Sequence, residues 1–192
     1  MPELTIAPRG EPIGYTLGGH DNDTYLLVKS EVCEGCGLIS PEKRRDAISS
    51  DVRVKKRRMD VSATYDGFTI VSTKFKGWVE SHYPDGVAFQ PLLSDPTFYV
   101  LSVSREIAFD SARRKTRFLN FCPVCKQYEE VIGATPGYVK ATPEPFSGLY
   151  RTDIAFGSGN SKHYLVIIDP KCYLECKQEH FAGAVFHPVY KS

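Results

Sequence analysis

With 192 residues, of which 42% are hydrophobic and 12% aromatic, the chain has enough apolar material to bury a core. Its 24 Lys and Arg residues nearly balance 23 Asp and Glu residues, and the resulting net charge of +1 argues against a protein that mainly coats phosphates or an anionic membrane. No apolar run approaches the roughly 18 residues that a membrane span needs, and the first residues lack the pattern of a signal peptide. We therefore expect a cytoplasmic protein with no membrane contact, forming a single domain over residues 1–192.

The first predicted elements surround a pair of cysteines. Residues 25–28 read as a short strand that leads into the knuckle Cys33-Glu34-Gly35-Cys36-Gly37, an arrangement typical of zinc ribbons. Residues 40–58 are polar and basic, so we expect a solvated connection there, with a helix beginning near Pro41.

A hairpin, a helix and a strand are predicted next. The apolar runs 61–65 and 68–71 flank Asp66-Gly67, and this dipeptide tolerates the positive φ angles of a tight turn. Ser72 is placed to cap a helix carrying Phe75, Trp78 and Val79, which ends before Gly86. Strands are expected at residues 87–89 and 98–103.

The second half begins with the knuckle Cys122-Pro123-Val124-Cys125, followed by a proline-rich loop over residues 134–147. A strand is expected at residues 154–156, where Asp153 takes a place similar to that of Asp60. The turn Gly157-Ser158-Gly159-Asn160 lacks the spacing of a phosphate-binding loop, so we interpret it as a hairpin turn.

An internal repeat links the two halves. Shifting residues 70–92 forward by 97 positions places them on residues 167–189, with five identities over 23 positions, including the pairs Gly86 and Gly183, and Pro91 and Pro188. These residues end the predicted helix and the predicted strand, so the match falls at structural boundaries. We predict an α+β fold of two pseudo-repeats, about residues 25–110 and 115–192, each with a knuckle, a β-hairpin, a helix and a strand.

The two CxxC knuckles predict one shared metal site. A two-residue gap turns the backbone so that both sulfurs face one ion, and tetrahedral zinc accepts four thiolates. Cys33, Cys36, Cys122 and Cys125 are therefore the candidate ligands of a single structural Zn²⁺, although 85 residues (122 − 36 − 1) separate the knuckles. The alternatives are a redox pair, whose βαβ context is missing, and two disulfides, which a reducing compartment disfavours.

Two further cysteines raise the question of a second metal. Cys172, Cys176 and His180 share one face of a predicted helix. Under the 97-residue shift, however, Cys172 matches Phe75 and Cys176 matches Val79, so we favour core packing for both cysteines. A second zinc and redox chemistry remain the alternatives.

No catalytic motif is present, so an enzyme is not predicted, and a metalloenzyme remains only an alternative. The basic clusters at residues 53–58 and 113–117 are compatible with nucleic-acid binding, as in many zinc ribbons. The near-neutral net charge favours two solvated charged faces instead.

The chain resembles bacterial proteins with two CxxCG-like knuckles that are grouped with the immunity proteins of polymorphic toxin systems. The resemblance rests on residues 33–37, on Ile70-Val71-Ser72 with the helix that leads to residues 86–91, and on residues 122–125, where Lys126 replaces the second glycine. It implies a non-enzymatic, zinc-stabilised protein that neutralises a cognate toxin by binding it.

Overall fold

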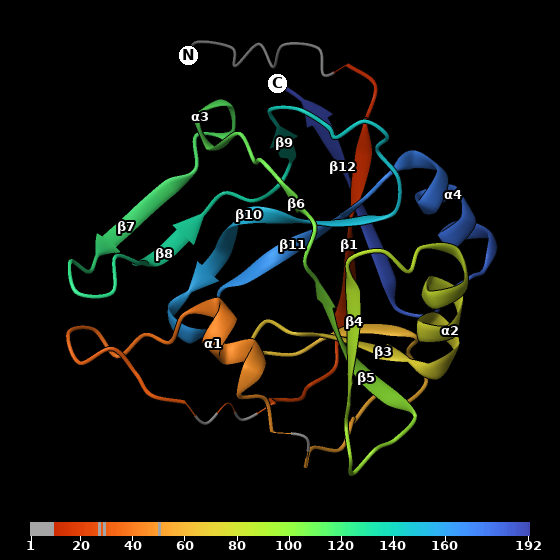
Figure 1. Ribbon diagram of the computed structural model, residues 1–192, viewed down its shortest axis with the longest axis horizontal. Helices are drawn as coiled ribbons and strands as arrows, with labels where there is room; N and C mark the ends of the chain where they lie inside the picture. Colours follow the sequence, from red (N-terminus) through yellow and green to blue (C-terminus); the bar gives the residue numbers. More distant parts are fainter. Residues whose placement is uncertain (1–9, 27, 29, 50) are drawn as a thin grey trace, which may run out of the picture.

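A computed structural model of the protein describes residues 10–26, 28, 30–49 and 51–192. The fold is α+β, as predicted, and consists mainly of one large mixed sheet with a few short helices (Figure 1).

The strands, in chain order, are β1 Gly14–Asp21, β2 Val61–Ala63, β3 Thr69–Ser72, β4 Val87–Pro91, β5 Phe98–Val103, β6 Glu106–Ile107, β7 Arg117–Phe121, β8 Tyr128–Ile132, β9 Gly137–Val139, β10 Leu149–Ser158, β11 His163–Ile168 and β12 Ala184–Lys191. The α-helices are α1 Pro41–Asp46, α2 Thr73–His82, α3 Ser111–Arg114 and α4 Pro170–Gln178, and residues Gly159–Ser161 form the 3₁₀ helix η1.

The predicted hairpin and helix of the first half are confirmed. β2 pairs antiparallel with β3 across the Asp66-Gly67 turn. The Ser72 hydroxyl accepts a hydrogen bond from the backbone N–H of Phe75 and caps α2. The predicted strands at residues 87–89 and 98–103 are β4 and β5.

Strand pairing repeats with the offset found in the sequence. Leu101 of β5 pairs with Thr69 and Phe89, whereas Leu17 of β1 pairs with Val166 and Phe186. Both partners of Leu17 therefore lie 97 residues beyond those of Leu101 (69 to 166 and 89 to 186). β5 thus lies antiparallel between β3 and β4, the strands before and after α2. In the same way, β1 lies antiparallel between β11 and β12, the strands before and after α4.

The middle strands come from different places along the chain. In the first half β5 follows β4, whereas in the second half the equivalent place is filled by β1, from the beginning of the described chain. β5 continues into β6, which pairs in parallel with β10, and β1 pairs in parallel with β2. The pairings lead from β5 and β6 through β10, β11, β1, β2 and β3 back to β5.

Helix ends follow the same offset. Asp169, which lies 97 residues after Ser72, caps α4 by accepting from the backbone N–H groups of Lys171 and Cys172. Gly86 and Gly183, also 97 residues apart, both have positive φ (70° and 83°), a conformation that glycine adopts without steric cost.

The two longer helices share the main hydrophobic core. Phe75, Trp78 and Val79 of α2 are buried in one cluster with Cys172 and Cys176 of α4. This burial agrees with the interpretation of the two cysteines as core residues, because a free thiol packs as a small apolar group.

Four expectations are wrong. The loop expected over residues 134–147 contains the strand β9, which pairs with β12. No strand is assigned at Tyr25, Leu26 or Val28, and Leu27 lies outside the described residues. The connection over residues 40–58 is not simply solvated, because its buried residues include Arg44, Ile48, Val52 and Val54. The second hairpin also begins earlier in the chain than the comparison of Asp60 with Asp153 implied. Val71 pairs with Val61, and Ile168, which lies 97 residues after Val71, pairs with Leu149.

Among the described residues, no helix is both long enough and apolar enough to cross a membrane.

Candidate metal centre

The first knuckle is a compact turn closed by its own backbone. The N–H of Gly37 donates to the carbonyl of Cys33 at 2.7 Å, and the N–H of Cys33 donates to the carbonyl of Leu38 at 2.9 Å. Gly37 has a φ of 72°, in the left-handed region that favours glycine. This turn directs the side chains of Cys33 and Cys36 toward one side.

The second knuckle is the turn between β7 and β8. Here the N–H of Cys122 donates to the carbonyl of Gln127 at 2.8 Å, which repeats the bond from Cys33 to Leu38. Lys126, at the position equivalent to Gly37, adopts a similar left-handed φ of 57°. The replacement of glycine by lysine therefore leaves the shape of the knuckle unchanged.

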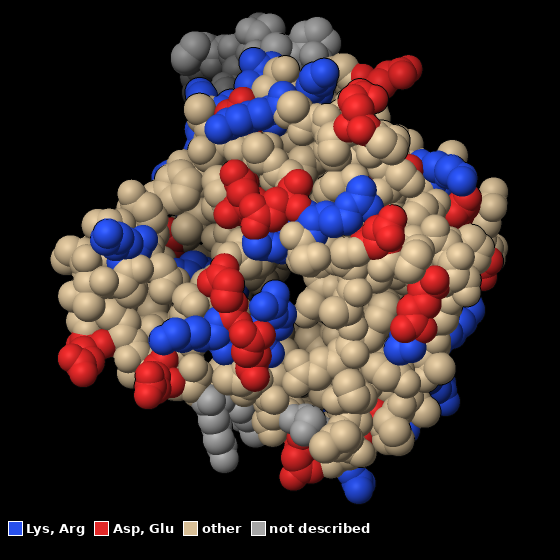
Figure 2. All heavy atoms as spheres, in the orientation of Figure 1, with Lys and Arg blue, Asp and Glu red and all other residues tan. Residues whose placement is uncertain are grey.

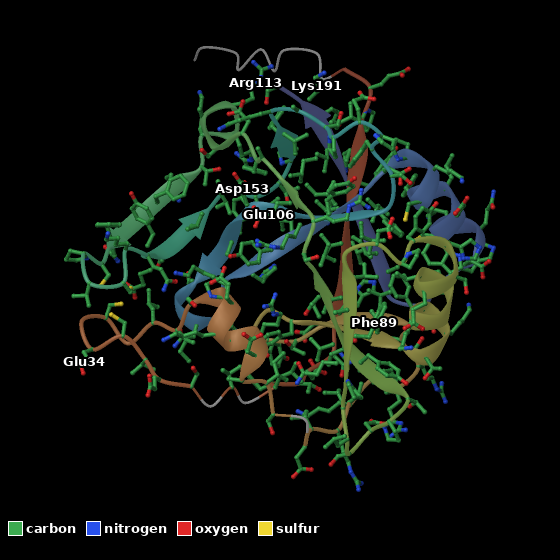
Figure 3. All side chains as sticks on the ribbon, in the orientation of Figure 1. Glu34, Phe89, Glu106, Arg113, Asp153 and Lys191 are labelled. Carbon is green, nitrogen blue, oxygen red and sulfur yellow. The ribbon has the colours of Figure 1, made fainter. Side chains whose placement is uncertain are left out.

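The fold brings the two knuckles together. The sulfur atoms of Cys33, Cys36, Cys122 and Cys125 all lie within 4.8 Å of one another. The Sγ atoms of Cys33 and Cys122 are 3.9 Å apart, and those of Cys36 and Cys125 are 3.5 Å apart. Figure 3 shows yellow sulfur atoms between the tip of the β7–β8 hairpin and the loop that carries Glu34.

These distances fit a tetrahedral metal site. Zn–S bonds of about 2.3 Å in a tetrahedron place neighbouring sulfurs about 3.8 Å apart. All six cysteines are free, so the two knuckles contain no disulfide. The donor set is therefore suited to Zn²⁺ or another ion that prefers thiolates.

Two of the four thiols have shifted pKa values of opposite sign. A hydrogen bond from the backbone N–H of Cys125 lowers the pKa of Cys122 to about 6. A backbone hydrogen bond from Leu38 favours the Cys36 thiolate, but burial and the neighbouring thiols raise the pKa of Cys36 to about 12. Four crowded thiolates repel one another, and a bound cation would relieve this repulsion.

A third segment, the turn between β10 and β11, supports both knuckles. Asn160 accepts a hydrogen bond from the N–H of Ile39 at 2.8 Å and donates to the carbonyl of Gly37 at 3.2 Å. The buried ammonium group of Lys162 donates to the carbonyl of Tyr128 at the start of β8. The predicted hairpin turn at residues 157–160 thus also holds the cysteine loops in place, a role that the sequence did not reveal.

Lys162 brings a positive charge close to the thiolates. Burial lowers the pKa of Lys162, while the charges of Cys125 and Cys36 act in the opposite direction. The backbone carbonyl of Lys162 accepts a 2.7 Å hydrogen bond from Arg44 of α1, which also donates to the carbonyl of Asp66. Arg44 and Lys162 both line a small cavity between α1 and the sheet, where Arg44 donates to two backbone carbonyls and Lys162 to one.

Cys172, Cys176 and His180 do not form a comparable group. Among the described residues, the four knuckle cysteines are the only set of three or more potential ligands close enough to share an ion. Cys172 is fully buried among apolar side chains, and a hydrogen bond with Cys176 together with burial raises its pKa. The geometry supports a packing role for these two cysteines.

Comparison of the chain with protein-family models and with curated protein sequences finds no match.

Proposed function

We propose that the four cysteines hold one structural zinc ion. The observation that carries this proposal is the approach of all four sulfur atoms to within 4.8 Å. Four protein thiolates complete the coordination of zinc and leave no position for water or substrate, which distinguishes a structural site from a catalytic one. When bound, zinc would join the first knuckle to the β7–β8 hairpin.

The same ion would join the two halves of the chain. We infer that these halves are related by duplication, and the recurring 97-residue offset in strand pairing, helix capping and left-handed glycines supports this inference. Each half would supply two of the four ligands.

We further propose that the chain functions by binding another protein, as an immunity protein that neutralises a bacterial toxin does. A closed metal site removes the main reason to expect catalysis, and binding is then left to the surfaces of the folded chain. The resemblance at the knuckles and at residues 70–91 supports the choice of a toxin as partner.

Metal content tests the site. The purified protein is expected to contain one zinc per chain, measured by elemental analysis after gel filtration. Cys172→Ala keeps the core apolar and should retain that zinc, whereas the double substitution Cys33→Ser/Cys36→Ser should lose most of it. No zinc in the unmodified protein, or zinc that depends on Cys172, would overturn the assignment.

Gene context and a protection assay test the binding function. We expect the gene to lie beside a gene for a large secreted toxin, and co-expression of this chain should restore growth to cells that produce the toxin domain. A salt-sensitive shift of DNA or RNA by the purified protein, without any such protection, would favour nucleic-acid binding instead.

A further inference from the structure

The β7–β8 hairpin exposes an unusual amount of apolar surface. All residues of β7 are exposed, and β7 ends the path of paired strands, so its outer edge pairs with no described strand. Figure 1 shows the hairpin projecting from the body on the side opposite α2 and α4, and in Figure 2 the surface over it is mostly tan. Contiguous apolar surface of this kind commonly marks a binding site.

Aromatic side chains form the centre of this surface. The ring of Tyr128 lies 5.1 Å from that of Phe118 and 5.0 Å from that of Phe121. Phe121 is 53% exposed, and Val124, in the adjacent knuckle, is 67% exposed. Aromatic residues held against one another lose little freedom on binding and often dominate the energy of protein interfaces.

Unpaired cations lie at both ends of the same hairpin. Lys115 and Arg117 lie at the base of the hairpin and Lys126 at its tip, all exposed, and none forms an ion pair with a described residue. Residues 110–132 contain five Lys or Arg and three Asp or Glu, a net charge of +2 compared with +1 for the whole chain. This surface therefore favours an acidic partner.

We propose that the outer surface of the β7–β8 hairpin binds a protein segment that carries apolar side chains flanked by Asp or Glu. This proposal rests on the proposed function, because it names the surface through which a protein partner would be held. The apolar side chains would pack on Phe118, Phe121 and Tyr128, and the carboxylates would face Lys115 and Arg117.

The mode of contact follows from the backbone. Asn120, the fourth of the five residues of β7, has a φ of 55°, so the edge strand is not evenly extended. A break of this kind hinders the addition of a partner strand, and we therefore assign binding to the side chains. Nucleic acid is less suitable, because exposed aliphatic groups such as Val124 do not stack on bases.

The test uses three labelled probes: a short synthetic peptide alternating Asp with Leu and Phe, the same peptide with Lys in place of Asp, and single-stranded oligothymidylate. We expect the acidic peptide to bind the zinc-loaded protein and to shift the NMR signals of β7 and β8. Phe121→Ser and Arg117→Glu should each weaken binding about tenfold, as for a central interface residue. Leu93→Ser is the matched control, because Leu93 is 72% exposed in the turn between β4 and β5.

Several outcomes would overturn the proposal. They are NMR signal shifts outside the hairpin, binding of the lysine peptide as tight as that of the acidic peptide, binding of oligothymidylate tighter than that of the acidic peptide, and association of the protein with itself through this surface. Zinc content and toxin protection are measured on the same variants. Loss of peptide binding with protection intact rejects only this surface, whereas peptide binding by the unmodified protein without any protection rejects only the toxin partner.

Discussion

At the scale of single residues, one side chain outside the four cysteines is bonded to the first knuckle at two points. The carboxamide of Asn160 contacts the first knuckle through both its oxygen and its nitrogen, and this residue lies 123 positions after Gly37 (160 − 37). Groups that orient ligands in this way commonly raise metal affinity, because the loop is already arranged when the ion arrives.

Replacement of Asn160 by alanine should therefore weaken zinc binding. We expect a decrease in affinity on the order of tenfold, measured by competition with a chromogenic chelator. Ser158→Ala is the control, because Ser158 is exposed in the same segment and its side chain forms no hydrogen bond with the knuckles. Equal affinities for the two variants would show that Asn160 does not support the site.

The sequence revealed the four clustered cysteines but not the residues that support them. CxxC spacing is a local pattern with a strong chemical requirement, so Cys33, Cys36, Cys122 and Cys125 were predictable. Asn160 and Lys162 act through contacts with segments distant in the sequence, and no local sequence pattern predicts those contacts. In particular, the run from Gly157 to Asn160 has the composition of an ordinary turn.

At the scale of elements, β1 was the largest omission. Its sequence contains Gly14, Gly18 and Gly19, which weaken the usual pattern of a strand. The structure explains two of them: a Cβ at Gly19 would lie 2.4 Å from the Cα of Ser62, and one at Gly14 would lie 2.8 Å from the carbonyl oxygen of Ile168. The hairpin and α2, by contrast, carry local signals at Asp66-Gly67 and Ser72 and were predicted.

Gly19→Ala should destabilise the protein, because the added methyl group would meet the backbone of β2. The expected loss is about 1–3 kcal/mol of the free energy of unfolding, the range for an overpacked site. Gly77→Ala is the matched control: Gly77 is exposed in α2 and has free space around it, so alanine should stabilise the helix by about 0.5–1 kcal/mol. Urea unfolding of both variants measures the difference, and effects of the same sign would contradict this account.

At the scale of the whole molecule, the metal centre and the main core lie apart. The core cluster is built from α2, α4 and the strands beneath them, whereas the four cysteines lie at the tips of the first knuckle and the β7–β8 hairpin (Figure 1). The protein therefore differs from a small zinc finger, which has little core without its metal.

Removal of zinc should weaken this protein without unfolding it. Closing the 85-residue gap between the knuckles (122 − 36 − 1) would stabilise the fold by about 4–5 kcal/mol in the chain-entropy estimate for a cross-link. After chelation we expect a lower denaturation midpoint, with amide protection retained in β1 and β11 and reduced in β7, β8 and residues 33–39. Complete loss of protection in β1 would show that the ion is needed for the core itself.

The position of β1 has a consequence for how the chain could be rearranged. Gly14 pairs with Val189, so the beginning of the first strand lies beside the last strand, whereas β4 and β5 are joined by only the six residues 92–97. A circular permutant that starts near Asn22 and carries residues 10–21 after a short linker at the C-terminus would give both halves the same order of elements. We expect this permutant to fold cooperatively and to bind one zinc, and failure of both would show that the order of β1 in the chain is required for assembly.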